Sequence, residues 1–83
     1  MYKVKYYDTV DPQNFELEFE RETEALMWIN EEMDTWYDLL CTMYPDSDIT
    51  WLNRLMDYGD TTEIYIPGTS VSVCCELIYE SIF

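Results

Sequence analysis

The chain has 83 residues, of which 48% are hydrophobic and 17% aromatic, and its 18 Asp and Glu residues face only four Lys and Arg residues. This length permits one domain, residues 1–83, and the aromatic content excludes the usual acidic disordered tail, which is poor in such residues. The formal net charge of −14 disfavours direct binding to nucleic acid, because a polyanion would be repelled.

Two segments near the start of the chain alternate between apolar and charged residues and predict an antiparallel β-hairpin. The first segment is residues 2–7, and the second is residues 15–20. Residues 8–14, which join them, contain the turn-forming types Asp, Pro and Asn. We expect the outer face of the hairpin to set Lys3 and Lys5 against a row of glutamates, so that half of the basic residues are neutralised within the protein. The alternating residues of the second segment are Phe15, Leu17 and Phe19 on one face, and Glu16, Glu18 and Glu20 on the other.

A long helix is predicted between Thr23 and Pro45, because the apolar residues there recur about every 3.6 residues. Thr23 is expected to be the N-cap, with Glu24 in the first turn, and Pro45 is expected to end the helix. The predicted core-facing stripe consists of Leu26, Ile29, Met33, Trp36, Tyr37, Leu40 and Tyr44.

A second, shorter helix is predicted after Pro45. Residues 46–48, with the sequence Asp-Ser-Asp, are typical of a helix N-terminus, and Gly59 is typical of the position that follows a helix. The apolar residues of this expected helix are Trp51, Leu52, Leu55 and Met56.

Two further strands complete the predicted fold. Residues 61–66 alternate, residues 67–68 are a turn-forming Pro-Gly pair, and residues 71–79 are rich in β-branched types. Residues 76–83 have a helical conformation as their alternative. The predicted class is α+β with the order ββααββ, in which two helices lie on one face of an antiparallel sheet.

The outer face of the long helix is the first candidate binding surface. Glu24, Glu31 and Asp38 are seven residues apart, which places one carboxylate about every 10 Å along a helix axis. Asp34 falls on the same face, and none of these four residues has a Lys or Arg three or four positions further on. The alternative interpretation is an ordinary solvated face, although such faces normally mix both signs of charge.

Two further features extend this candidate surface. Trp28 falls off the core-facing stripe, beside Glu24, Glu31 and Glu32, and an exposed Trp among acids is typical of an interface anchor. Its alternative is that the second helix or the C-terminal segment covers it. A second acidic group is expected at the two ends of the short helix, and it consists of Asp46, Asp48, Asp57 and Asp60.

The sequence favours binding over catalysis. It contains no His, so a Ser or Cys nucleophile lacks its usual base and a zinc site is disfavoured. Cys41, Cys74 and Cys75 are expected to be buried free thiols in a reducing cytosol. Residues 46–57 begin like a calcium loop, but Trp51 stands where such loops need a glycine, so helix capping explains the aspartates better. We therefore expect no enzymatic activity, no metal and no cofactor.

The same pattern bears on location and partners. The first five residues form no apolar signal region, and no apolar run approaches the length of a membrane span. We expect a cytoplasmic protein that binds neither membrane nor nucleic acid directly, and a monomer is favoured.

In its small size, extreme acidity, aromatic-rich body and lack of a catalytic signature, the chain resembles phage-encoded anti-CRISPR proteins and other DNA mimics that block nucleases. The resemblance is one of whole-chain character over residues 1–83 and involves no shared motif. It implies an inhibitor, acting in the cytoplasm of a bacterial host cell, that binds a CRISPR effector nuclease or complex where the effector would grip DNA. Its partner-binding residues would be those of the two candidate surfaces, namely Glu24, Trp28, Glu31, Glu32, Asp34, Asp38, Asp46, Asp48, Asp57 and Asp60.

Two other functions are compatible with the same composition. One is an immunity protein or antitoxin that neutralises a basic toxin nuclease, which would rely on the same electrostatic attraction. The other is a soluble structural or regulatory module of a mobile element, in which the charge serves solubility alone, and this one predicts no tight binding to any basic nuclease.

Overall fold

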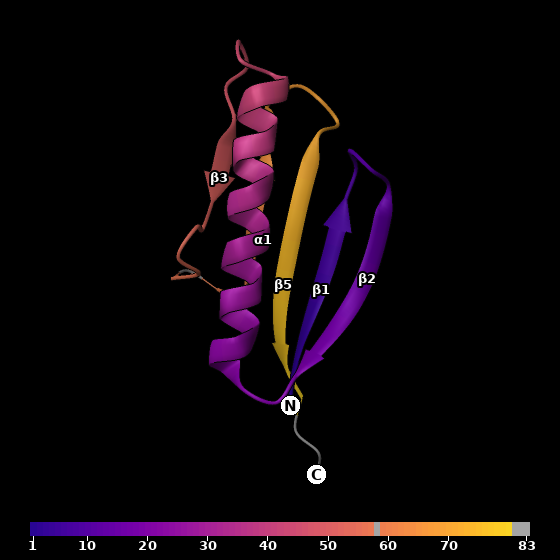
Figure 1. Cartoon of the computed structure of the whole chain (residues 1–83), viewed down its shortest axis with the longest axis vertical. Helices are drawn as coiled ribbons and strands as arrows, with labels where there is room; N and C mark the ends of the chain where they lie inside the picture. The colour runs from indigo at the N-terminus through magenta and orange to yellow at the C-terminus, as the bar shows by residue number, and fades with distance from the viewer. Residues whose placement is uncertain (58, 81–83) are drawn as a thin grey trace.

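The computed structural model describes residues 1–57 and 59–80, which form a five-stranded antiparallel sheet with one helix on one of its faces (Figure 1). The predicted α+β class with an antiparallel sheet is therefore confirmed. The predicted ββααββ order is wrong, because the chain has one helix and five strands in the described part. The elements are β1 (Tyr2–Asp8), β2 (Gln13–Phe19), α1 (Glu22–Met43), β3 (Thr50–Leu52), β4 (Thr61–Tyr65) and β5 (Ser72–Tyr79).

The predicted hairpin is confirmed as β1 and β2, which pair over all seven residues of each strand. Lys3 lies opposite Glu18, and Lys5 lies opposite Glu16. The turn starts at Asp8, whose Oδ1 accepts hydrogen bonds from the backbone N–H of Val10, at 2.8 Å, and of Asp11, at 3.3 Å. This is an Asx-type turn, in which an aspartate side chain replaces a backbone acceptor.

The strand order across the sheet is β2-β1-β5-β4-β3, so the last strand of the chain lies in the middle. β5 pairs with both β1 and β4, which confirms a strand over residues 72–79 rather than a helix from residue 76. The predicted turn also forms, with Gly68 at a φ of 78° that favours glycine. Residues 81–83, the end of the segment for which a helix was the alternative, lie outside the described residues.

Helix α1 is anchored by one buried stripe, as the apolar spacing predicts. Ala25, Ile29, Met33 and Leu40 are fully or almost fully buried against the sheet. Each large apolar side chain in such a position stabilises the fold by roughly 1.5–3 kcal/mol relative to an exposed one. The other predicted stripe residues, Leu26, Trp36, Tyr37 and Tyr44, are half-buried around this core.

The ends of α1 differ slightly from the prediction. The N-cap is Arg21, in an extended conformation and without a capping side-chain hydrogen bond, so Thr23 lies inside the first turn. Glu24 is in that turn, as expected. At the other end the helix stops at Met43, and the N–H of Tyr44 donates to the carbonyl of Leu40 at 2.8 Å.

The predicted second helix does not form, and residues 50–52 pair with β4 as an edge strand instead. Trp51 explains the preference, because its Nε1 donates to Thr62 Oγ1 at 2.8 Å and its ring lies 5.4 Å from that of Tyr37. Asn53, with a φ of 54°, then turns the chain away from the strand. A helix of about ten residues is marginal without tertiary support, and these contacts support a strand.

Candidate functional site

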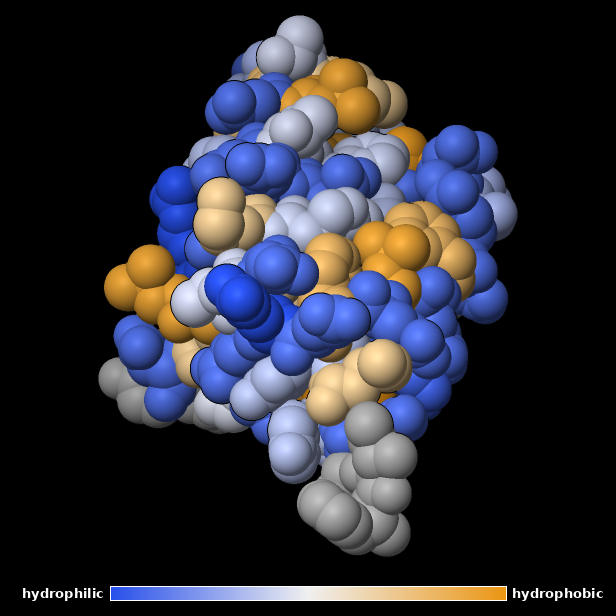
Figure 2. Space-filling model, turned by 60° about the horizontal axis from the view of Figure 1, so that its bottom comes forward, coloured by the Kyte–Doolittle hydropathy of each residue, from blue (hydrophilic) through white to orange (hydrophobic). Residues whose placement is uncertain are grey.

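Acidic side chains surround the whole molecule rather than forming a single cluster. All 18 Asp and Glu residues are among the described residues, and all are exposed except Asp8, Glu32 and Glu63. Asp8 is buried for a structural reason, because its Oδ2 accepts a hydrogen bond from Tyr6 Oη at 2.9 Å in addition to the turn contacts of its Oδ1. Figure 2 shows the consequence on one face, where hydrophilic residues dominate and hydrophobic ones form separate patches.

Most of the positive charge is used inside the protein. Lys3 Nζ lies 2.9 Å from Glu80 Oε1 and 3.6 Å from Glu16 Oε2, and Lys5 Nζ lies 3.9 Å from Glu16 Oε1. The hydrogen bond to Glu80 is the main cause that raises the pKa of Lys3. The prediction that the hairpin neutralises its own lysines is confirmed for both residues, with Glu80 as a partner that the sequence analysis missed.

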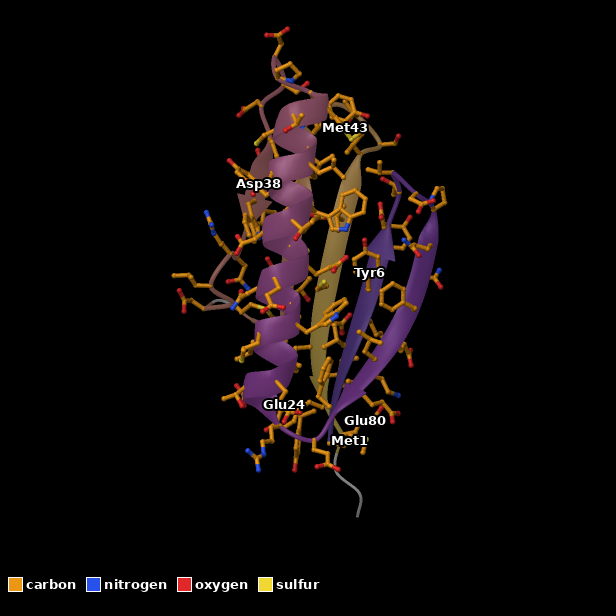
Figure 3. All side chains as sticks on the ribbon, viewed as in Figure 1. Met1, Tyr6, Glu24, Asp38, Met43 and Glu80 are labelled. Atoms are coloured by element: carbon orange, nitrogen blue, oxygen red, sulfur yellow. The ribbon has the colours of Figure 1, made fainter. Side chains whose placement is uncertain are left out.

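The outer face of α1 presents three carboxylates in a row, as the sequence predicts. Glu24 lies near the start of the helix and Asp38 towards its end (Figure 3). Glu31 lies between them in the sequence, and all three are exposed. Within the described part of the chain, no ion pair involves any of the three. Their backbones belong to a helix that is fixed by a buried stripe, so the row is rigid. We call Glu24, Glu31 and Asp38 the helix row.

Asp34 differs from the helix row, because Arg54 partly neutralises it. Arg54 Nη2 lies 3.2 Å from Asp34 Oδ1, and its guanidinium carbon lies 4.3 Å from the centroid of the Trp51 ring. Arg54 is 20 residues away in sequence, so a search for partners three or four positions along the helix could not find it. Asp34 therefore stands at the edge of the candidate surface.

Trp28 and Glu32 also depart from the prediction, because both are half-buried. The Trp28 ring meets those of Tyr6 and Phe15 nearly edge-on, with centroids 6.2 and 6.1 Å away. The predicted exposure of Trp28 is therefore wrong, and among the described residues the rings that contact it belong to the hairpin, a segment that the alternative did not name. Trp28 and Glu32 lie on the flank of α1 towards the hairpin, and Trp28, four residues after Glu24, borders the helix row.

The second acidic group is divided between two places. Asp46 and Asp48 lie in the connection that follows α1, whereas Asp57 and Asp60 lie in the connection between β3 and β4 (Figure 1). The backbone carbonyl of Asp60 accepts a hydrogen bond from the N–H of Leu77 at 2.7 Å. Asp60 also lines a hollow together with Glu22, the first residue of α1, whereas Asp46 and Asp48 follow the last turn of that helix. All four are exposed, but they do not form the single group that the predicted short helix implied.

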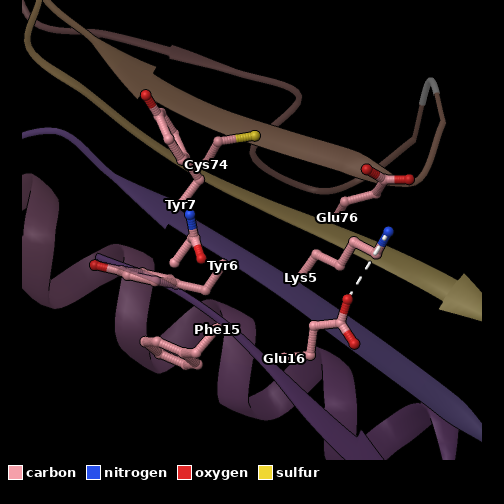
Figure 4. Close-up of a pocket in the computed structure, with 8 residues that line it drawn as sticks. Lys5, Tyr6, Tyr7, Phe15, Glu16, Cys74 and Glu76 are labelled. Carbon is pink, nitrogen blue, oxygen red and sulfur yellow. Dashed lines mark ion pairs between the residues drawn. The ribbon is translucent and has the colours of Figure 1, made fainter. Parts of the chain in front are cut away.

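A hollow of about 310 Å³ on the face of the sheet that α1 leaves open was missed by the sequence analysis (Figure 4). Lys5, Tyr7 and Cys74 line it, together with Glu16 and Glu76. Burial, and then the charges of Glu63 and Glu76, raise the pKa of the Cys74 thiol, so the hollow holds no activated thiolate. The sequence did carry one signal for this face, because Lys3, Lys5 and Tyr7 occupy alternate positions of β1 and must therefore point to the same side of the sheet.

Three further observations limit the chemistry of the described residues. They contain no group of three or more Cys, Asp or Glu side chains placed to hold a metal ion. No helix that they form has the length and apolar character required to cross a membrane. Cys41, Cys74 and Cys75 are all free thiols, but the expected burial is confirmed only for Cys75, because Cys74 is half-buried and Cys41 is exposed.

Comparison of the chain with models of known protein families, with curated proteins and with solved structures finds no match.

Proposed function

We propose that this protein is an acidic inhibitor that binds the basic nucleic-acid-binding surface of an RNA-guided effector and blocks its binding to target DNA. The observation that carries the proposal is the helix row, with three exposed carboxylates on one rigid helix face and no ion pair to them from the described residues. A basic channel that evolved to hold phosphates is the natural counterpart of such a row.

The spacing of the helix row supports this partner. Seven residues of α-helix advance about 10 Å, and phosphates along one strand of B-DNA follow one another about every 3.4 Å along the axis. One carboxylate of the row therefore falls at about every third phosphate position. The same lysines or arginines of a DNA channel could pair with either the phosphates or the carboxylates. Because the helix is already ordered, its backbone loses little conformational entropy when it binds, and the entropic cost falls mainly on the exposed side chains.

The distribution of charge favours attraction at long range. Three of the four basic side chains are in ion pairs within the molecule, and fourteen excess acids remain. A preformed field of one sign raises the rate of encounter with a basic partner, and this rate falls steeply as salt screens the field. The proposed inhibitor is therefore fast-binding and salt-sensitive.

The experiment is a competition assay in which effectors charged with guide RNA bind labelled target DNA in the presence of the protein. The double variant Glu31→Lys with Asp38→Lys should reduce inhibition by about tenfold or more, since each reversal replaces attraction with repulsion. The matched control is Asp11→Lys with Glu20→Lys, which changes the net charge equally at exposed positions outside the helix. Equal inhibition by the two double variants would show that the helix row is not the site.

A further inference from the structure

We propose that the outer edge of β2 binds an extended, basic segment of a partner protein, which joins the sheet as an additional strand beyond β2. This surface is separate from the helix row, and the inference does not depend on the proposed function. β2 is one end of the strand order, and in the described part of the chain its only neighbour is β1. An edge strand leaves a row of backbone N–H and C=O groups available for pairing with another chain.

The geometry of β2 suits strand addition better than that of the opposite edge. β2 has seven residues that pair with β1 in continuous register, without a bulge, and Pro12 lies before it rather than within it. β3, at the other edge, has only three residues. Long, regular edges without proline or bulges are the ones that accept an added strand.

Charge on the open face of the sheet alternates in sign from strand to strand. Lys5 of β1 lies opposite Glu76 of β5 on one side and opposite Glu16 of β2 on the other. An acidic strand, a basic strand and an acidic strand therefore follow one another towards the edge. Cross-strand pairs of opposite charge stabilise a sheet, and like charges destabilise it. The next strand in this series should be basic.

The glutamates of β2 retain capacity for such a strand. Lys3 forms one ion pair with Glu16 and another with Glu80, although the residue directly opposite it in β2 is Glu18. Among the described residues, no ion pair includes Glu18 in β2 or Glu20, which directly follows the strand. A lysine or arginine on the far side of β2 would supply the partner that β1 does not.

The other face of β2 indicates what the remaining side chains of the partner strand should be. Phe15, Leu17 and Phe19 point to the helix side, but each is only half-buried. Phe15 stacks on Tyr6 with a centroid distance of 4.6 Å, and its outer side borders the open edge. Apolar side chains at alternate positions of an added strand would cover these rings. The expected ligand therefore alternates between Lys or Arg and an apolar residue.

A second copy of this chain is a poorer occupant than a basic segment. Antiparallel pairing of two β2 strands in one set of registers places glutamate opposite glutamate on the open face. The other set places glutamate opposite Leu17 or a phenylalanine, because side chains alternate with a period of two. Each arrangement loses either the charge pairing or the apolar packing, and both bring two chains of charge −14 together.

The probe is a capped eight-residue peptide of alternating lysine and valine, titrated at 150 mM salt into the isotope-labelled protein while amide signals and amide hydrogen exchange are recorded. Residues 13–19 should shift and gain protection, because their outward N–H groups acquire acceptors. Two control peptides should bind about tenfold more weakly or worse. One has four lysines followed by four valines, and the other is the alternating peptide with its backbone nitrogens methylated at every second residue.

Protein variants separate edge binding from general attraction. Glu18→Lys should weaken the alternating peptide by about fivefold, through loss of one charge pair and gain of one repulsion. Asp46→Lys makes the same change in net charge at an exposed position in the connection that follows α1, and it should alter affinity by less than about twofold. Equal effects of the two variants, equal binding of the control peptides, or protection centred on α1 would each overturn the proposal. The proposal would also be overturned if the protein sedimented as a dimer and the amides of β2 were protected from exchange in the absence of peptide.

Discussion

Asp34 and Arg54 form an ion pair between the middle of α1 and the connection that follows β3, with Arg54 Nη2 3.2 Å from Asp34 Oδ1. The same guanidinium stacks on Trp51, whose ring in turn packs against Tyr37. A carboxylate, a guanidinium and two aromatic rings thus connect the helix to the edge of the sheet. The contact also separates Asp34 from the acids of the helix row, which have no such pair among the described residues.

Replacement of Arg54 by alanine should lower the free energy of unfolding by about 0.5–1.5 kcal/mol. Both charged groups are more than half exposed, so solvent screens the ion pair and the stacking on Trp51 supplies much of the effect. Urea unfolding followed by circular dichroism measures the change. Arg21→Ala removes the same charge from an exposed position with no ion pair in the described part of the chain, and it should be nearly neutral. Equal losses in the two variants would contradict the assignment.

Tyr6 and Tyr7 are adjacent in β1 and point to opposite faces, which makes them a matched pair. Tyr6→Phe should lower the free energy of unfolding by about 1.5–3 kcal/mol, because the buried Asp8 carboxylate loses a charged hydrogen bond. Tyr7→Phe should change it by less than about 0.5 kcal/mol, since Tyr7 is 51% exposed. Thermal unfolding of both variants is the measurement. A neutral Tyr6→Phe would show that Asp8 does not depend on this hydroxyl.

Stability should fall at alkaline pH because of Cys75. Burial raises the pKa of this thiol from an ordinary value of 9.0 to about 12. Between these values the unfolded chain loses the proton and the folded chain keeps it, so the free energy of unfolding decreases as pH rises, by at most about 1.4 kcal/mol per pH unit. Burial, with the hydrogen bond to Asp8, also raises the pKa of Tyr6, which adds a loss of the same sign at higher pH.

The contribution of Cys75 can be isolated by substitution. Urea unfolding of Cys75→Ala between pH 9 and pH 12 should give a shallower decrease than the unmodified protein, whatever its stability at pH 7. Cys41→Ala should leave the decrease unchanged, because Cys41 is exposed. If the slope for Cys75→Ala matches that of the unmodified protein, the thiol is not the group that titrates.

The hairpin shows what local sequence determines in this protein. A period of two on both segments, with turn-forming residues between them, excludes every antiparallel register that is one residue out, because such a slip would turn one apolar set away from the core. That register places Lys3 and Lys5 beside glutamates, and the structure has them there. The stripe of α1 was predictable for the same reason, since Ile29, Met33 and Leu40 share one face.

The errors concern contacts between residues distant in sequence. Residues 46–57 have caps and apolar spacing that suit a helix, but Trp51 gains more from Tyr37 and Thr62 as part of a strand. The insertion of β5 between β1 and β4 is equally non-local, and α1 contacts the two hairpin strands as well as β4 and β5. As a result Trp28 reaches the rings of the hairpin, which a helical wheel of α1 alone could not show. Asn53, a residue type that tolerates a positive φ, was the one local signal against the second helix.

The most direct test of the proposed inhibition is competition for target DNA by an effector bound to its guide RNA, measured at a series of salt concentrations. The account predicts that the protein displaces DNA, that its inhibition constant rises steeply between 50 and 300 mM salt, and that the Glu31→Lys and Asp38→Lys double variant loses the effect while remaining folded. Unimpaired DNA binding by every effector tested, or full inhibition by that double variant, would contradict it.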